Sequence, residues 1–103
     1  MVSLQGGKFM EKVILVINVE DYDKWRKYFD DNIAFRKTHG SREAYIHRSI
    51  VNPNEIVLFF KWESIDSARK FFESEEVKEK MKEAGISGDP VLYYIEEIER
   101  SIA

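Results

Sequence analysis

Residues 56–72 restrict the fold of this chain more than any other segment. Residues 56–62 read Ile-Val-Leu-Phe-Phe-Lys-Trp, and such β-branched and aromatic residues favour a buried strand. Ser64 follows, and its hydroxyl can accept a hydrogen bond from a free amide of a first helical turn. The apolar residues after it fall on one helical stripe: Ile65, Ala68, Phe71 and Phe72. The segment therefore predicts a buried strand that leads directly into a helix packed back on the sheet.

Three further strands are predicted from runs of apolar and β-branched residues, at 9–19, 42–51 and 91–99. Asn52-Pro53-Asn54 is a tight turn, so the third strand, predicted at 55–62, forms a hairpin with the second. Residues 88–90, Gly-Asp-Pro, are expected to form a second turn before the last strand.

A first helix is predicted between a cap at Asp21 or Asp23 and about Thr38, followed by Gly40. Its apolar stripe consists of Tyr22, Trp25, Phe29 and Ile33. A further helical segment follows the second helix and begins at Ser74. The order is β-α-β-β-α-β. Right-handed crossovers and short connections then favour an α+β, ferredoxin-like fold with a four-stranded antiparallel sheet and helices on one face.

The length of 103 residues suits one domain, which we expect at 9–99 between a flexible N-terminal tail at 1–8 and a C-terminal tail at 100–103. The chain has no cysteine, which excludes a disulfide framework, a thiolate metal site and a cysteine nucleophile. The net charge of -3 argues against nucleic acid or an anionic membrane as a partner. The sequence shows neither a signal peptide nor an apolar run long enough to span a bilayer, so we expect a cytoplasmic protein.

The predicted sheet has helices on one face only, yet three of its strands are apolar on both faces. Leaving about five large side chains in water would forfeit roughly 7 to 15 kcal/mol, at about 1.5 to 3 kcal/mol each. That loss rivals the whole stability of a domain. We therefore expect a second copy to cover the open face in a symmetric homodimer, and the alternative is an unusually hydrophobic exposed face.

The order of elements and three stretches of sequence resemble the dimeric α/β-barrel superfamily. These stretches are residues 60–64, Phe-Lys-Trp-Glu-Ser, then Ala68 with Phe71-Phe72, and residues 74–77, Ser-Glu-Glu-Val. Within that superfamily the chain is most similar to antibiotic biosynthesis monooxygenase-like domains and small cyclase-like proteins, over about residues 10–99. The resemblance implies two ferredoxin-like subunits paired as a dimeric barrel. Because members of the superfamily have many activities, the fold does not select one of them.

The resemblance also gives candidate site residues. The haem-degrading branch has an Asn on the first strand, a Trp at the end of the third and a His on the late helix. Asn18 and Trp62 match the first two, but residues 77–82 contain no His to bind iron, which argues against haem degradation. Cofactor-free oxygenases need an aromatic pocket and polar groups that deprotonate a phenol. By similarity, the candidate catalytic residues are Asn18, Tyr45 and His47, and the candidate substrate-binding residues are Trp25, Phe29, Phe60 and Trp62.

Each polar candidate also has a structural interpretation. His47 can act as a general base, but an interface or exposed strand histidine is the commoner case. Asn18, a polar side chain in an apolar strand, marks either a polar pocket or a satisfied cross-strand hydrogen bond. His39 suits the negative end of the helix dipole. Arg36 and Arg48 can pair with an acidic ligand group, although surface ion pairing with the plentiful Asp and Glu is favoured.

Two functions from different classes follow. The first is a cofactor-independent monooxygenase or cyclase-like enzyme that acts on an aromatic or polyketide-like substrate. The second is a non-catalytic ligand-binding, regulatory or stress module with the same cavity. A purely structural dimer with a filled core is the third interpretation. We expect no cofactor, and no metal either, because two distant histidines without cysteine are a poor ligand set for a transition metal.

Overall fold

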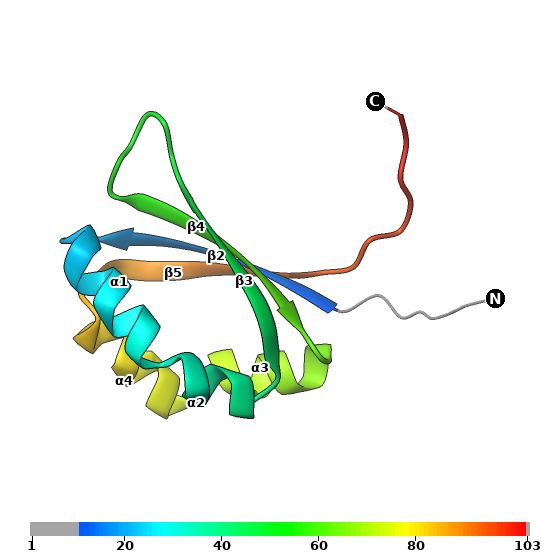
Figure 1. The fold of residues 1–103 in the computed structure, drawn as a ribbon, viewed down its shortest axis with the longest axis horizontal. Coiled ribbons are helices and arrows are strands. Elements are labelled where there is room, and N and C mark those ends of the chain that lie inside the picture. The colour runs from blue at the N-terminus through cyan, green and yellow to red at the C-terminus, as the bar shows by residue number, and fades with distance from the viewer. Residues whose placement is uncertain (1–10, 103) are drawn as a thin grey trace.

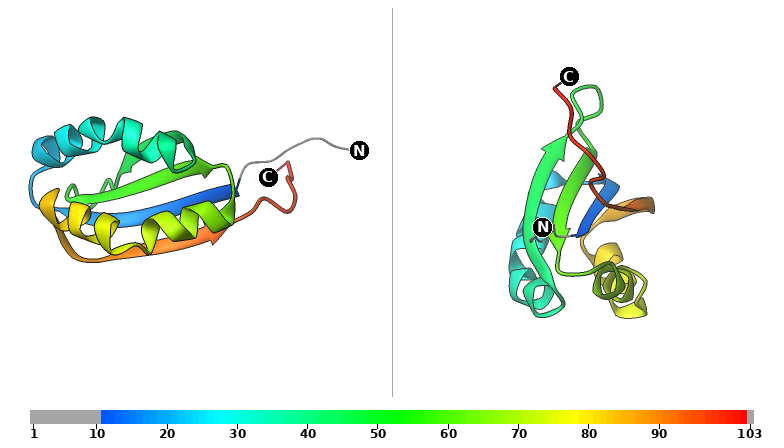
Figure 2. Two further views of the ribbon diagram at one scale, coloured as in Figure 1. Left: turned by 90° about the horizontal axis from the view of Figure 1, so that it is seen from below. Right: turned by 90° about the vertical axis from the view of Figure 1, so that its right-hand side faces the viewer.

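Within residues 11–102, the part that this computed structural model describes, four strands form one antiparallel sheet with helices on one face (Figures 1 and 2). The strand order is β3-β4-β2-β5. Along the chain the elements are β2 (Glu11–Val19), α1 (Tyr22–Asp31), α2 (Ile33–Thr38), β3 (Ser41–Arg48), β4 (Glu55–Trp62), α3 (Ile65–Phe72), α4 (Glu75–Glu83) and β5 (Ile86–Ile95). The predicted α+β, ferredoxin-like arrangement is confirmed, whereas the predicted N-terminal tail at 1–8 lies outside the described residues. Residues 96–102 have no regular secondary structure.

The two central strands, β2 and β4, supply most of the sheet's contribution to the core. Their alternate residues face the helices and are buried: Val13, Leu15, Ile17, Val19, Ile56, Leu58, Phe60 and Trp62. The intervening residues on the open face are also largely apolar and only partly buried, among them Ile14, Val16, Val57 and Phe59. The prediction that these strands are apolar on both faces is therefore confirmed for β2 and β4.

The first helical region is broken in two, and the prediction of one helix to about Thr38 was wrong in this respect. Asn32 lies at the break with a φ of -107° and a ψ of 18°, and its side-chain Nδ2 donates to the carbonyl of Tyr28 at 2.9 Å. Such a side-chain bond competes with the helical ladder. Past the break Ile33 is 46% exposed, although the predicted stripe has it buried, and Arg36 is buried instead.

The last strand begins earlier than predicted. Residues 88–90 were expected to form a turn, but they belong to β5. Val16 pairs with Val91 and Asn18 with Ser87, so two steps along β2 match four steps along β5. The extra residues form a bulge, and the φ of 72° at Gly88 supplies the left-handed geometry that it needs. β3 is shorter than the predicted 42–51, because its last residues belong to the hairpin loop.

The junction of helix and sheet near Trp62 follows the predicted design. Ser64 caps α3 by accepting from the amide of Ser67. Gly40 has a φ of 115°, and a Cβ there would lie 2.7 Å from Nε1 of Trp62. Because glycine lacks this atom, the Trp62 indole can approach and donate to the carbonyl of His39 at 3.0 Å. Trp62 is therefore fixed at both its apolar ring and its polar nitrogen.

Candidate functional site

A cavity of about 80 Å³ lies between the helices and the sheet. Its floor comes from β2 and β4, through Leu15, Ile17, Leu58 and Phe60. Its walls come from the helices and are rich in aromatic rings: Trp25, Phe29, Phe35, Phe71 and Phe72. The lining also includes four polar or charged residues: Tyr28, Asn32, Arg36 and Lys80.

The aromatic rings form a connected wall. The ring centroids of Trp25 and Phe29 are 5.1 Å apart, and those of Phe29 and Phe60 are 6.3 Å apart. Phe60 in turn lies 5.6 Å from Phe72, and all these pairs are tilted. Such tilted arrangements are favourable for aromatic pairs and hold the rings in defined orientations. The wall offers flat apolar surfaces to any molecule that enters the cavity.

Arg36 is the charged residue most deeply involved in the lining, since its side chain from α2 is only 9% exposed. Its guanidinium donates to the carbonyl of Phe29 at 2.7 Å and lies 3.6 Å from the centre of the Phe29 ring. Burial lowers the pKa of Arg36 to about 10, which leaves it protonated at neutral pH. No ion pair among residues 11–102 includes it.

The other polar residues of the lining come from the end of α1 and from α4. Lys80 on α4 donates to the Oδ1 of Asn32 at 3.3 Å and lies 4.8 Å from the Phe35 ring centre. The hydroxyl of Tyr28 donates to Glu83 at 2.7 Å, and this bond raises the pKa of Tyr28 to about 12. The hydrogen bonds of Tyr28 and Asn32 thus connect α4 to the end of α1 and to the helix break beside the cavity.

A second, larger hollow of about 400 Å³ lies between α4 and the start of β5. Phe72, Met81 and Ile86 line both this groove and the cavity. Methionine is unbranched and adopts many conformations at low cost. Of the three shared residues, Met81 therefore has the side chain that changes conformation most easily.

The structure brings together three of the four predicted substrate-binding residues. Trp25, Phe29 and Phe60 all line the cavity. Trp62 does not line it, because this fully buried ring packs against Phe71 and Phe72, with centroids 5.0 and 5.2 Å away. Its indole N–H is already bonded to the His39 carbonyl and is occupied by a structural contact.

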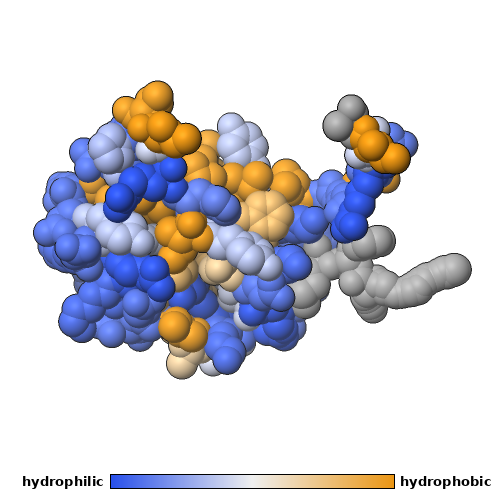
Figure 3. Space-filling model, turned by 45° about the horizontal axis from the view of Figure 1, so that its top comes forward, coloured by the Kyte–Doolittle hydropathy of each residue, from blue (hydrophilic) through white to orange (hydrophobic). Residues whose placement is uncertain are grey.

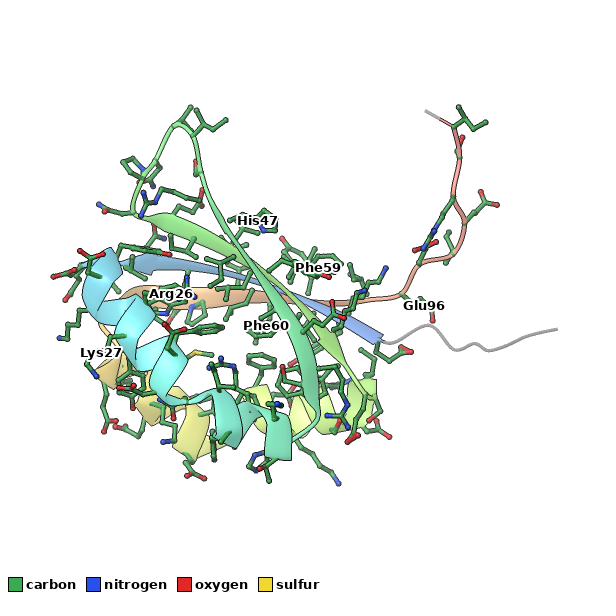
Figure 4. The ribbon with its side chains drawn as sticks, in the orientation of Figure 1. Arg26, Lys27, His47, Phe59, Phe60 and Glu96 are labelled. Carbon is green, nitrogen blue, oxygen red and sulfur yellow. The ribbon has the colours of Figure 1, made fainter. Side chains whose placement is uncertain are left out.

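The three predicted catalytic residues lie on the other face of the sheet. Figure 4 shows His47 on the side away from the helices, where it pairs across the strands with Val57, and its Nδ1 lies 3.2 Å from the Val57 carbonyl. Tyr45 shares that face and donates to Glu43, which raises the pKa of Tyr45 and lowers that of Glu43. Asn18 is exposed, so burial demands no partner for its amide. The sheet separates all three from the cavity.

Sequence reasoning missed Asn32, Tyr28 and Lys80 as lining residues. One signal was present, because Trp25, Phe29, Asn32 and Arg36 are spaced at i, i+4, i+7 and i+11. The predicted stripe followed the apolar Ile33 instead. Arg36 was considered as a partner of an acidic ligand, but the favoured interpretation, an ion pair at the surface, was wrong.

The chemistry of the lining is one-sided. It contains two cationic side chains, an amide and a phenol, but no Asp, Glu or His. It can therefore stabilise an anion and donate hydrogen bonds, whereas it offers no carboxylate or imidazole base. Within the described residues, no three His, Asp or Glu side chains gather in the way that a metal site requires. In that same part of the chain, every helix is too short or too polar to cross a membrane.

Comparison with solved structures gives the same fold in several bacterial proteins. A proposed antibiotic biosynthesis monooxygenase from Bordetella bronchiseptica matches with a TM-score of 0.71 and 20% identity, over 89% of this chain and 100% of that one. SnoaB, a cofactor-independent oxygenase from Streptomyces nogalater, matches with a TM-score of 0.65 and 13% identity, over 92% and 98%.

A monooxygenase from the gene ActVA-Orf6 of Streptomyces coelicolor, solved in complex with nanaomycin D, matches with a TM-score of 0.60 and 16% identity, over 92% and 93% of the two chains. No family model and no curated protein matches the sequence. These likenesses establish that the chain has the fold of antibiotic biosynthesis monooxygenases, as the sequence resemblance implied.

Proposed function

We propose that this protein binds a small aromatic or polyketide-like molecule in the cavity between helices and sheet and acts on it as a cofactor-independent monooxygenase or cyclase-like enzyme. The observation that carries the proposal is the cavity wall, where the rings of Trp25, Phe29, Phe60 and Phe72 follow one another at 5.1 to 6.3 Å. The shared fold adds support, since SnoaB is a cofactor-independent oxygenase and the Streptomyces coelicolor monooxygenase was solved in complex with nanaomycin D.

The reaction requires an electron-rich ring that is first deprotonated. In the simplest case the CH₂ group in the keto tautomer of a phenol becomes C=O. One atom of O₂ enters the product and the other leaves as water, so O₂ accepts four electrons from the substrate. Arg36 and Lys80 line the cavity and would stabilise the phenolate that reacts with O₂. The cavity lining has no carboxylate or imidazole, so the phenol proton would pass to water or to a carboxylate of the neighbouring groove, which Glu75, Glu79 and Asp89 line.

The size of the cavity sets a condition on binding. A volume of about 80 Å³ is small, because ligand pockets usually measure about 300–1,000 Å³. The groove of about 400 Å³ beyond Met81 supplies the missing space. We therefore propose that a ligand displaces Met81 and occupies both hollows.

A non-catalytic ligand-binding or regulatory module is the second candidate. It is favoured by one specific observation, the lack of a carboxylate or imidazole among the lining residues. Catalytic roles for Asn18, Tyr45 and His47 stay predictions, and they require a ligand held against the open face of the sheet. Trp62 as a ligand contact also stays a prediction.

The test uses anthrone, a tricyclic ketone with a phenolic tautomer, under O₂ and under N₂. Turnover is expected only under O₂, with one O₂ consumed for each product that has gained one oxygen and lost two hydrogens. Ala84→Leu fills the cavity and should abolish both binding and turnover, whereas Ala34→Leu on the exposed side of α2 should change neither. Saturable binding without turnover would select the binding module, and the absence of binding would contradict both candidates.

We further propose that two copies pair through the open faces of their sheets. Figure 3 shows hydrophobic residues across that face, where Tyr93 is 54% and Val91 is 45% exposed beside Val16, Val57 and Phe59. Burying these residues against a second sheet would gain about 25 cal/mol for each Å² removed from water. In such a dimer Asn18, Tyr45 and His47 would lie between the two sheets.

Light scattering and native mass spectrometry test the dimer. The wild-type protein should have twice the mass of the chain, and Phe59→Glu should give a folded monomer, because a charge at this interface would be buried without a partner. Ile33→Glu is the matched control, since Ile33 is an exposed apolar residue on the helix side. A monomeric wild type would contradict the proposal. The cytoplasmic location, the lack of nucleic-acid partners and the single domain at 9–99 stay predictions.

A further inference from the structure

Arg36 carries a buried charge that no carboxylate neutralises in the described part of the chain. Asp30 acts electrostatically on Arg36, but the Asp30 carboxylate is itself bonded to Arg26 at 3.0 Å. The contacts of the Arg36 guanidinium are the carbonyl and the ring of Phe29. A charge held out of water without a counter-ion is costly, so its retention beside a cavity calls for an explanation.

The other arginines differ from Arg36 in one of two ways. Arg26, Arg42, Arg69 and Arg100 each pair with a carboxylate. Arg48 has no such pair, but it is exposed and its guanidinium lies over the ring of Tyr22 at 4.5 Å. Arg36 alone among these six is both buried and without a carboxylate, and it is the one that lines the cavity.

Lys80 places a second cation in the same lining. Its ammonium bonds the amide oxygen of Asn32 at 3.3 Å rather than a carboxylate, and lies over the ring of Phe35. Asn32, Arg36 and Lys80 thus gather at one side of a cavity whose lining contains no acidic residue. These two cations therefore lack a negatively charged partner from the lining.

We propose that the ligand is an aromatic acid whose ring lies among the cavity's aromatic side chains and whose ionised oxygen binds Arg36, with Lys80 as the second cation. The ionised group is a carboxylate or an acidic phenol, since both present a negatively charged oxygen. This inference rests on the proposed function, because it specifies the class of molecule that the same cavity binds. Charge-assisted hydrogen bonds in a site shielded from water are the strong ones, so the anion contributes selectivity as well as affinity.

The binding experiment compares three naphthalenes of the same ring size by tryptophan fluorescence and calorimetry at neutral pH. These are 2-naphthoate, which carries a carboxylate, 2-naphthamide, its neutral counterpart, and 2-naphthol, whose ionisation shifts its absorbance to longer wavelength. The wild type should bind 2-naphthoate at least about tenfold more tightly than 2-naphthamide. Bound 2-naphthol should ionise at a lower pH than free 2-naphthol. A strong preference for 2-naphthoate with little shift in the ionisation of 2-naphthol indicates a carboxylate site, and the reverse indicates a phenolate site.

Arg36→Met tests the assignment, because it keeps a long apolar side chain and removes the charge. It should reduce the preference for 2-naphthoate to about twofold or less while 2-naphthamide still binds. Arg48→Met, which removes a ring-stacked arginine outside the cavity lining, should keep the full preference. Lys80→Met should give a partial loss of the preference and serves as a second variant, since Lys80 is only partly buried and methionine keeps an apolar chain over the Phe35 ring.

Each remaining outcome overturns the inference in a recognisable way. Equal affinity of the wild type for 2-naphthoate and 2-naphthamide would overturn it and leave aromatic binding intact; this comparison requires no variant. A preference that survives Arg36→Met would remove Arg36 from the site. Failure of all three naphthalenes to bind would overturn the proposed function together with the inference.

Discussion

Phe59 and Phe60 are neighbours on β4 and point to opposite faces of the sheet (Figure 4). Phe60 is 2% exposed and lies within 6.3 Å, between ring centroids, of Phe29, Trp62 and Phe72. Phe59 is only partly buried, and its aromatic neighbour is Tyr45 at 6.1 Å. Two residues of one type, one position apart, thus differ in what covers them. The hydrophobic pattern predicts that both faces of the strand are buried, and the fold determines whether residues of the same chain bury each face.

Charges show the opposite contrast between the two faces. On the open face Glu43 accepts from Tyr45 and pairs with Lys61 at 3.7 Å, so charge is compensated there. On the helix-covered face Arg36 is buried beside an aromatic ring without a carboxylate. The helix-covered face is therefore packed by its own chain around a cavity and holds a charge without a carboxylate, whereas on the open face the charge of Glu43 is paired and the apolar residues lack cover. This difference motivates both an anionic ligand for the first face and a second copy for the other.

The largest expected effect comes from truncating the two phenylalanines separately. Phe60→Ala should lower the free energy of unfolding by about 3–5 kcal/mol, because it removes a buried ring that packs against three other aromatic rings. Phe59→Ala should cost the monomer about 1 kcal/mol and make the melting temperature depend more strongly on protein concentration, since it weakens the proposed dimer. Urea unfolding at several protein concentrations measures both. Equal, concentration-independent losses would contradict the distinction between the faces.

Gly40→Ala tests the covered face next to Trp62. The substitution should cost at least about 2 kcal/mol, because alanine disfavours a φ of 115° and its Cβ would displace the indole N–H from the His39 carbonyl. Gly85→Ala is the matched control. Gly85 also has a positive φ, 85°, but a Cβ there has open space around it, so only the backbone cost of about 1–2 kcal/mol applies. A comparable loss for both glycines would mean that the Trp62 contact contributes nothing.

Arg36→Met should leave the ligand-free protein as stable as the wild type, or more stable by up to about 1 kcal/mol. Burial lowers the pKa of Arg36 from its usual 12.5 to about 10, so the native state binds this proton less tightly than the unfolded chain. The protonated side chain therefore lowers stability below about pH 10, and methionine removes that cost. The Phe29 carbonyl keeps the amide of Asn32 as a donor. A loss of several kcal/mol in thermal unfolding would show that Arg36 is structural.

The smallest effect concerns Tyr28 at the edge of the covered face. Its bond to Glu83 raises the pKa of Tyr28 from 10.0 to about 12. The native state thus binds the phenolic proton more tightly than the unfolded chain, and this stabilisation is present below pH 10 and lost as the pH rises towards 12. Tyr28→Phe should make the decrease in the free energy of unfolding between pH 10 and 12 smaller, by less than about 1 kcal/mol, since the pair is exposed. An unchanged alkaline profile would mean that the bond contributes no stability.

The sequence by itself determined the order of elements and the parts of the core with strong local signals. β4 was predicted with its observed bounds, because a run of β-branched and aromatic residues is preceded by a proline turn and followed by a serine cap. Trp25, Phe29 and Phe60 were predicted as ligand contacts and line the cavity, since large aromatic residues on inward faces converge where helices cover a sheet. These features are local, or depend only on the period of the pattern.

Only the tertiary structure decided on which face of the sheet each polar candidate lies and which buried charge has no ion pair. Asn18, Tyr45 and His47 were grouped with the aromatic residues by similarity, but strand alternation and the pairing register place them across the sheet from the cavity. Arg36 lies on one helical stripe with Trp25 and Phe29, but only the packing of α2 made this stripe, rather than the one that contains Ile33, the buried one. Register and helix breaks depend on contacts between distant segments, and the pattern of one segment does not contain them.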